Sequence, residues 1–279
     1  MKQVHILLIN CNDAKGLIAA ITQVIFAMDL NIEVMREFVE EETNRFFMRC
    51  EFSGEVDADA LHAMLRERLP QDSYIVINPK SKKDIVIMAT KEHHCLSDLL
   101  TRFYFNELSA NVKAVICNHP NLESFVKNFG VPFHHISHEN RTKHEFEVEI
   151  LKVLGNYKPD YIILAKFMRI LSPDFVSKYE NRIINIHHSF LPAFIGANPY
   201  MQAFHRGVKL IGATAHIVNN QLDEGPILTQ KVIEVGHNFN AKKLVETGHE
   251  VEKQVLAEAC KLMFEDKVFV SGNKTIILK

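Results

Sequence analysis

The chain has 279 residues, of which 47% are hydrophobic and 24% are charged, with a formal net charge of -2. This length fits two domains, and the near-neutral charge gives no sign of a nucleic-acid partner. The five scattered cysteines contain no CxxC pair, which favours reduced thiols, and no apolar run is long enough for a signal peptide or a membrane span. We therefore expect a cytoplasmic globular protein.

Residues 3–79 contain the pattern strand, helix, strand, strand, helix, strand. The four predicted strands are VHILLIN, NIEVMREFV, RFFMRCEF and SYIVIN, and the two predicted helices are KGLIAAITQVIFAM and DADALHAMLRERL. This order is typical of the split βαβ, or ferredoxin-like, arrangement. The polar stretch PKSKK follows at residues 79–83. We expect a domain boundary there, with a first domain at residues 1–80.

From Asp84 onward, short apolar runs alternate with helical stretches. This alternation predicts an α/β second domain at residues 84–279, with a Rossmann-like, mostly parallel sheet between helices. Further along, residues 210–218 and 227–235 are predicted strands joined by the loop NNQLDEGP. Residues 241–263 are a predicted amphipathic helix, and a hairpin that turns at Ser271, Gly272 and Asn273 is expected to close the chain.

Polar residues end one of the apolar runs, in the stretch INIHHS. Asn185 and His187 point to the same side of an extended chain because side chains alternate along it. Ligands collect at the carboxyl ends of parallel strands, and an amide beside an imidazole suits stabilisation of an oxyanion. A carboxylate that orients water would complete such a site, and NNQLDEGP supplies Asp223. The spacing predicts the set Asn185, His187 and Asp223.

Plainer interpretations of the same residues remain open. Asp223, followed by Glu224, Gly225 and Pro226, is also typical of ordinary turn chemistry. The 15 histidines include His134, His135, His138 and His144, but none of these has HExxH spacing or an accompanying cysteine pair. We therefore expect no metal.

Two regions resemble known families. The stretch from INIHHSFLP to LDEGPILTQ (residues 184–230), with AKFMRILSP upstream, resembles the folate-dependent formyltransferases, and the resemblance covers most of residues 84–279. CNDAKGLIAAIT and LNIEVM resemble an ACT domain, a module that typically binds amino acids. The combination implies an N-terminal ferredoxin-like ACT domain (βαββαβ) fused to a C-terminal formyltransferase-fold domain.

The resemblance implies roles for individual residues. Asn185, His187 and Asp223 match the three residues that act on the formyl group of 10-formyltetrahydrofolate. His216 also matches a histidine of several relatives, although a buried strand histidine is an equal interpretation. The segments that match the folate-binding segments contain Met168, Arg169, Ile170, Leu171, Asn219 and Asn220. The implied ACT effector site contains Asp13, Gly16 and Asn31, with glycine or methionine as expected effectors and a homo-oligomer as the expected assembly.

One departure from the family pattern bears on the acceptor. The glycinamide ribonucleotide formyltransferases carry a glycine-rich turn (GNGSNL in form) where this chain has KEHHCL at residues 91–96. Glycines let backbone amides close on a phosphate, and these side chains do not. Water is then the expected acceptor, so that 10-formyltetrahydrofolate yields formate and tetrahydrofolate without a cofactor, supplying formate for purine biosynthesis. The alternatives are formyl transfer to a small amine and a sensor without activity.

Overall fold

The computed structural model describes residues 3–193 and 199–279, and it divides into two compact units. The first comprises residues up to Ser81 together with Asp266–Ser271 and Ile276–Lys279, and the second comprises Lys82–Glu265 and Gly272–Thr275. Residues 194–198, a few positions after the INIHHS stretch, lie outside the described residues. No helix of the two described ranges is long and apolar enough to cross a membrane.

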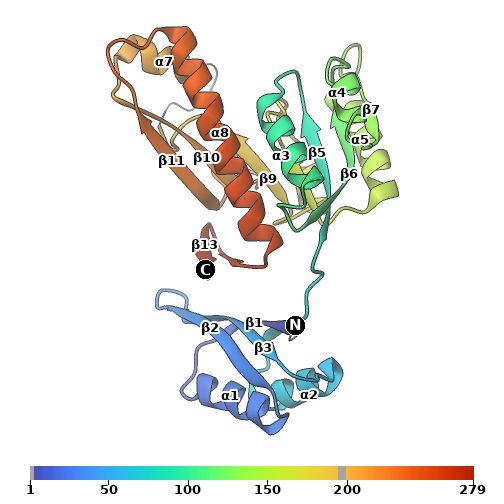
Figure 1. Cartoon of the computed structure of the whole chain (residues 1–279), viewed down its shortest axis with the longest axis vertical. Helices are drawn as coiled ribbons and strands as arrows, with labels where there is room; N and C mark the ends of the chain where they lie inside the picture. The colour runs from blue at the N-terminus through green and yellow to red at the C-terminus, as the bar shows by residue number, and fades with distance from the viewer. Residues whose placement is uncertain (1–2, 194–198) are drawn as a thin grey trace. The chain divides into compact units, whose positions relative to one another are not determined.

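The first unit is a four-stranded antiparallel sheet with two helices (Figure 1). Its strands lie in the order β2-β3-β1-β4, which, with the helices between them, is the predicted split βαβ order. The core combines alternate residues of β1 and β3 with the buried faces of both helices. The elements are β1 (Val4–Asn12), α1 (Leu17–Ala27), β2 (Asn31–Glu40), β3 (Arg45–Ser53), α2 (Ala58–Arg68) and β4 (Tyr74–Ile77).

The second unit contains a seven-stranded sheet in the order β11-β10-β9-β8-β5-β6-β7. The five strands from β9 to β7 are parallel, whereas β10 and β11 run antiparallel to their neighbours. The sheet is thus mostly parallel, as predicted, and it brings the carboxyl ends of β5, β8 and β9 to one edge. The strands are β5 (Lys83–Ala89), β6 (Ala110–Cys117), β7 (Phe133–His135), β8 (Tyr161–Leu164), β9 (Ile183–His187), β10 (Leu210–Ile217) and β11 (Ile227–Glu234).

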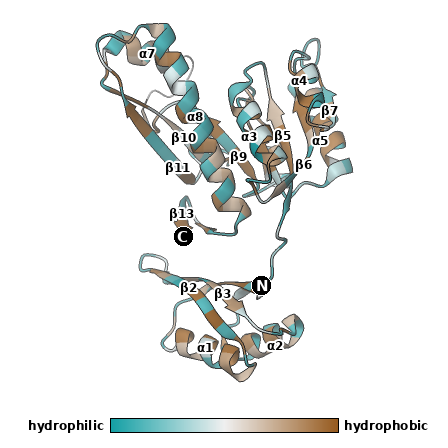
Figure 2. Ribbon diagram, viewed as in Figure 1, coloured by the Kyte–Doolittle hydropathy of each residue, from teal (hydrophilic) through white to brown (hydrophobic). Residues whose placement is uncertain are grey.

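The helices of this unit begin at residues suited to their positions. Thr142 and Glu145 form a capping box at the start of α5, and Ser172 caps α6, which has a proline in its first turn. Helices α5 and α6 pack on one core of the sheet, while the amphipathic α8 packs on β9, β10, β11 and α3 (Figure 2). The helices are α3 (His94–Tyr104), α4 (Glu123–Lys127), α5 (Lys143–Tyr157), α6 (Pro173–Lys178), α7 (Pro199–Arg206) and α8 (Ala241–Phe264).

The structure differs from the predicted elements at two places. Helix α7 has no counterpart among them. The hairpin of β12 (Val268–Ser271) and β13 (Lys274–Ile277) is expected in the second domain, but most of it groups with the first unit. There Phe269 and Leu278 pack with Leu8 and Phe47, because β1 and β3 turn apolar side chains to the face opposite the helices.

Candidate active site

Strand β9 presents its last polar residues on one face. Asn185 and His187 are two residues apart, and His187 is the final residue of the strand. On the antiparallel neighbour β10, His216 pairs with Asn185, next to a register shift in the pairing of β10 with β11. Such an irregularity redirects nearby side chains. The sheet therefore positions Asn185, His187 and His216 together.

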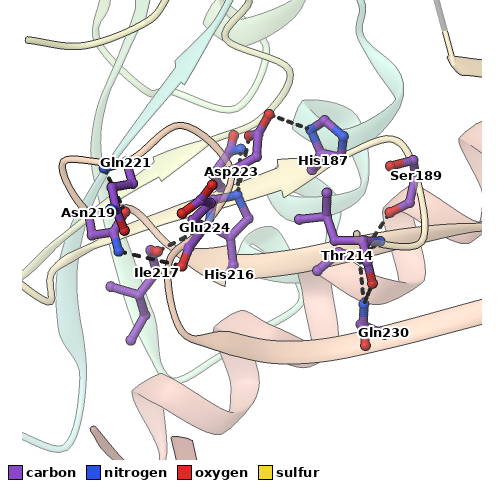
Figure 3. A network of polar contacts seen from close by, with 12 residues as sticks. His187, Ser189, Thr214, His216, Ile217, Asn219, Gln221, Asp223, Glu224 and Gln230 are labelled. Carbon is purple, nitrogen blue, oxygen red and sulfur yellow. Dashed lines mark hydrogen bonds and ion pairs between the residues drawn. The ribbon is translucent and has the colours of Figure 1, made fainter. Parts of the chain in front are cut away.

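The loop between β10 and β11 brings Asp223 to His187 and His216 (Figure 3). An Asp223 oxygen lies 3.3 Å from Nδ1 of His187, and its other oxygen lies 3.6 Å from Nε2 of His216. Asp223 has a φ of 58°, the left-handed conformation of a turn. The turn interpretation is therefore correct for its backbone, while its side chain contacts the two histidines. A Cβ at Gly225 would lie 1.7 Å from the carbonyl oxygen of Ile217, so this loop can approach β10 only with glycine there.

The electrostatics of Asp223 favour a carboxylate. Burial raises its pKa, but hydrogen bonds from His187 and His216, and the charges of both rings, outweigh burial. The pKa of Asp223 therefore lies well below its usual range. At neutral pH this residue is an anion, which can accept a proton from water or stabilise an imidazolium.

The ring of His216 orients the amide of Asn185. Its Nδ1 lies 3.0 Å from the carbonyl oxygen of Ile217, which only accepts hydrogen bonds, so Nδ1 carries a proton. An imidazolium at His216 donates from Nε2 to Asp223, whereas a neutral ring, protonated at Nδ1, accepts at Nε2 from Nδ2 of Asn185, which lies 3.1 Å away. One N–H of the amide is then engaged, and the second N–H can donate to an oxygen of a ligand.

His187 is oriented differently. Its Nδ1 faces Asp223, while its Nε2 is buried and has no hydrogen-bond partner among the described residues. Buried polar atoms in native proteins are nearly always satisfied, so an unpaired one beside a cavity points to a ligand or water. His187, Asn185 and Asp223 all line one cavity of about 390 Å³.

The same cavity receives most of the predicted folate-binding residues. Its lining includes Met168, Arg169, Ile170, Leu171, Asn219 and Asn220, but not His216. Met168, Ile170 and Leu222 are exposed apolar side chains at this cavity, suited to the flat face of an aromatic ligand. The segment before α6 is fixed because the buried Glu147 accepts hydrogen bonds from the backbone and hydroxyl of Ser172.

Sequence reasoning missed the residues that support the end of β9. Thr214 donates from its hydroxyl to the carbonyl oxygen of Ser189 and accepts from Gln230 (Figure 3). It also missed His188 and Lys166, which line the cavity. Burial, followed by the ammonium of Lys166, lowers the pKa of His188 to about 4, so this ring is neutral at pH 7. A polar residue inside an apolar strand was the signal for Thr214.

The predicted effector residues lie in the first unit. Asp13 and Gly16 line a cavity of about 450 Å³ with Glu37 and Phe38. Asn31 is not part of that lining; its amide donates to Glu33 instead. The structure therefore brings together two of the three residues.

Groups with the residue types of a metal site lie elsewhere in the second unit. Within the described ranges there are two overlapping groups, Glu92 with His94 and His249, and His94 with Cys95 and Glu252. None of Asn185, His187 and Asp223 belongs to them, nor do the four histidines at 134, 135, 138 and 144.

Similarity to known proteins places this fold in a class. Residues 83–260 match the family model described as formyl transferase. A glycinamide ribonucleotide transformylase structure from Symbiobacterium toebii is 27% identical, with a TM-score of 0.68, over 72% of this chain and 96% of that one. This chain is therefore longer than that transformylase and contains a part that the transformylase lacks.

Other relatives match over the whole length. The formyltetrahydrofolate deformylase of Haemophilus influenzae is 49% identical over 100% of both chains. The crystal structure of a formyltetrahydrofolate deformylase from Pseudomonas syringae pv. tomato is 36% identical, with a TM-score of 0.93, over 99% of this chain and 94% of that one. The chain belongs to the formyltetrahydrofolate deformylase family.

Proposed function

We propose that this chain is a hydrolase that converts 10-formyltetrahydrofolate and water to formate and tetrahydrofolate, the reaction that the name of its family describes. The observation that carries the proposal is the unpaired Nε2 of His187, buried in the cavity that Asn185 and Asp223 also line. The family membership and the apolar cavity entrance support a folate as the substrate.

The geometry fits attack by water on the formyl carbon. Asp223, an anion, takes a proton from water directly or through His187, and a C–O bond forms. The second N–H of Asn185 and a protonated His187 stabilise the oxyanion. The C–N bond to N10 then breaks, the proton taken from water is delivered to N10, and the formic acid that forms loses its remaining proton and leaves as formate. These steps use no redox cofactor and no metal, and we expect turnover to withstand a chelator.

A direct assay tests this function. Purified protein with 10-formyltetrahydrofolate and no added acceptor should release formate and tetrahydrofolate in equal amounts. Formyl transfer to a small amine is the alternative, because the same three residues also serve an amine nucleophile. If formate appears only after an amine is added, the transferase is correct and the hydrolase is wrong.

For the first unit we propose an ACT-type regulatory role. The split βαβ order supports it, as does the cavity lined by Asp13 and Gly16, although Asn31 lies outside that lining. Glycine and methionine are the proposed effectors, and a homo-oligomer is the proposed assembly. Activity that is indifferent to both amino acids would contradict the regulatory role. The cytoplasmic location and the supply of formate for purine biosynthesis stay predictions.

A further inference from the structure

A second polar cluster lies beyond one end of the catalytic cavity. Its centre is Glu252 on α8, which is fully buried. One oxygen of Glu252 lies 2.9 Å from Nε2 of His94 and 3.3 Å from Nζ of Lys166. Its other oxygen accepts a hydrogen bond from the hydroxyl of Tyr200 at 2.5 Å. We call Glu252, His94, Lys166 and Tyr200 the Glu252 cluster.

Helices α8 and α3 each provide a residue that makes this cluster possible. A Cβ at Gly248, one turn before Glu252, would lie 2.2 Å from Cζ of Tyr200. Only glycine lets the Tyr200 ring lie against α8 and its hydroxyl reach Glu252. His94 belongs to the first turn of α3, within KEHHCL. The segment that replaces a glycine-rich turn is therefore tied to α8 by Glu252.

Lys166 supplies the cation of the cluster. Its ammonium lies 3.3 Å from Glu252 and 3.6 Å from Glu92, so positive charge is already present between the two carboxylates. The rings of His94 and His249 are stacked, with centroids 3.9 Å apart and an interplanar angle of 10°, and Nε2 of His94 bonds directly to Glu252. These contacts describe an ionic network more closely than a metal centre.

The backbone of Lys166 is strained. It follows β8 with a φ of 61°, a left-handed conformation that glycine adopts freely and that strains other residues. Lysine is also among the side chains least often buried, yet Lys166 is only 4% exposed. The side chain at this position therefore has a use that offsets both costs.

That use follows from where Lys166 lies. Lys166 and His188 both line the catalytic cavity, and Glu252 holds Lys166 from the far side. Lys166 thus forms part of the cavity wall, and its ammonium is paired with the carboxylates of Glu252 and Glu92. Such a wall leaves room for water and takes up space that a larger nucleophile needs.

We propose that Lys166, held in place by Glu252, is a specificity-determining residue that keeps acceptors larger than water from the formyl carbon. The proposal rests on the hydrolase function proposed above. In the transfer that it prevents, the amine nitrogen bonds to the formyl carbon, the bond from that carbon to N10 breaks, and the amine's lost proton passes to N10.

The test is the partition of formyl groups between water and glycinamide. Lys166→Gly opens the wall and relieves the backbone strain, so the ratio of N-formylglycinamide to formate should rise about 10-fold or more over the wild type. Lys158→Gly is the matched control, because Lys158 also has a positive φ of 45° but is an exposed residue at the end of α5. Its ratio should equal that of the wild type.

A second variant covers misfolding of the first. Glu252→Gln keeps the shape of the side chain and releases Lys166 from the ion pair, so its partition ratio should rise by a smaller factor. An unchanged ratio in every folded variant overturns the proposal, even when the wild type hydrolyses its substrate. A wild type that releases no formate contradicts the proposed function instead, so the two failures are distinguishable.

Discussion

Two carboxylates of the second unit differ in how completely the groups around them are paired. Asp223 and Glu252 both face histidines, and in both the partners outweigh burial, which leaves the pKa of Glu252 at about 2 and that of Asp223 well below its usual range. Both oxygens of Glu252 are paired within the protein, whereas the histidine that faces Asp223 keeps a buried nitrogen unpaired among the described residues. An incomplete network therefore marks the place for a ligand, and a complete network marks a wall.

The largest expected effect comes from removing the charge at the incomplete network. Asp223→Asn keeps the shape of the side chain but cannot accept a proton, so kcat for formate release should fall about 10³-fold. Glu224→Gln is the matched control in the same loop, since Glu224 is exposed, and its kcat should match the wild type. Near-normal turnover of Asp223→Asn would remove Asp223 from the mechanism.

A somewhat smaller loss should follow removal of the oxyanion donor. Asn185→Ala deletes the amide that His216 orients, and kcat should drop on the order of 10²- to 10³-fold with KM changed far less. Steady-state kinetics separates the two constants. A rise in KM at unchanged kcat would mean that Asn185 binds substrate without favouring the transition state.

The free energy of unfolding should depend on pH through His188, which lines the cavity together with Lys166. His188 has a folded-state pKa of about 4, below its ordinary 6.5, so the unfolded chain binds more protons between these values. The free energy of unfolding should therefore fall as pH drops from 6.5 to 4, and the share due to His188 should be roughly 3 kcal/mol. Urea titrations should show a flatter fall for His188→Gln. Loss below pH 4.5 from protonation of Glu252 persists in both proteins. Parallel curves would refute this assignment.

The smallest effect should come from opening the complete network by one hydrogen bond. Tyr200→Phe keeps the ring against Gly248 but leaves one oxygen of Glu252 unpaired, so the free energy of unfolding should fall by about 1.5 kcal/mol. Tyr104→Phe is the control, because Tyr104 is 62% exposed, and it should unfold like the wild type. Equal stability of both variants would show that the hydrogen bond from Tyr200 to Glu252 adds nothing to folding.

The two networks also differ in how far the sequence predicts them. Asn185 and His187 end an apolar run and Asp223 lies in a short loop, so alternation along a strand and the placement of ligands in parallel sheets are enough to group them. The first unit's element order follows from periodicity in the same way.

The Glu252 cluster was not predictable by these rules. It joins His94 in the first turn of α3, Lys166 two residues after the end of β8, and Glu252 of α8, which is 158 positions further along the chain than His94. One signal was present, since Glu252 falls on the apolar stripe of α8 between Val251 and Val255. The sequence also predicts the C-terminal hairpin but not the core that it joins, because such short strands contain too few residues to show a pattern.

The close passage of Gly225 beneath the carbonyl of Ile217 bears on how this protein tolerates change. The position of residue 223 is set by the main chain of the loop. The loop can pass this close to Ile217 because Gly225, two residues after position 223, has no side chain. Position 223 can therefore be exchanged for asparagine or glycine, which accept its positive φ, while the loop keeps its path. Position 225 does not tolerate exchange in this way. Even Gly225→Ala would displace the loop and abolish activity, although no reacting atom is changed.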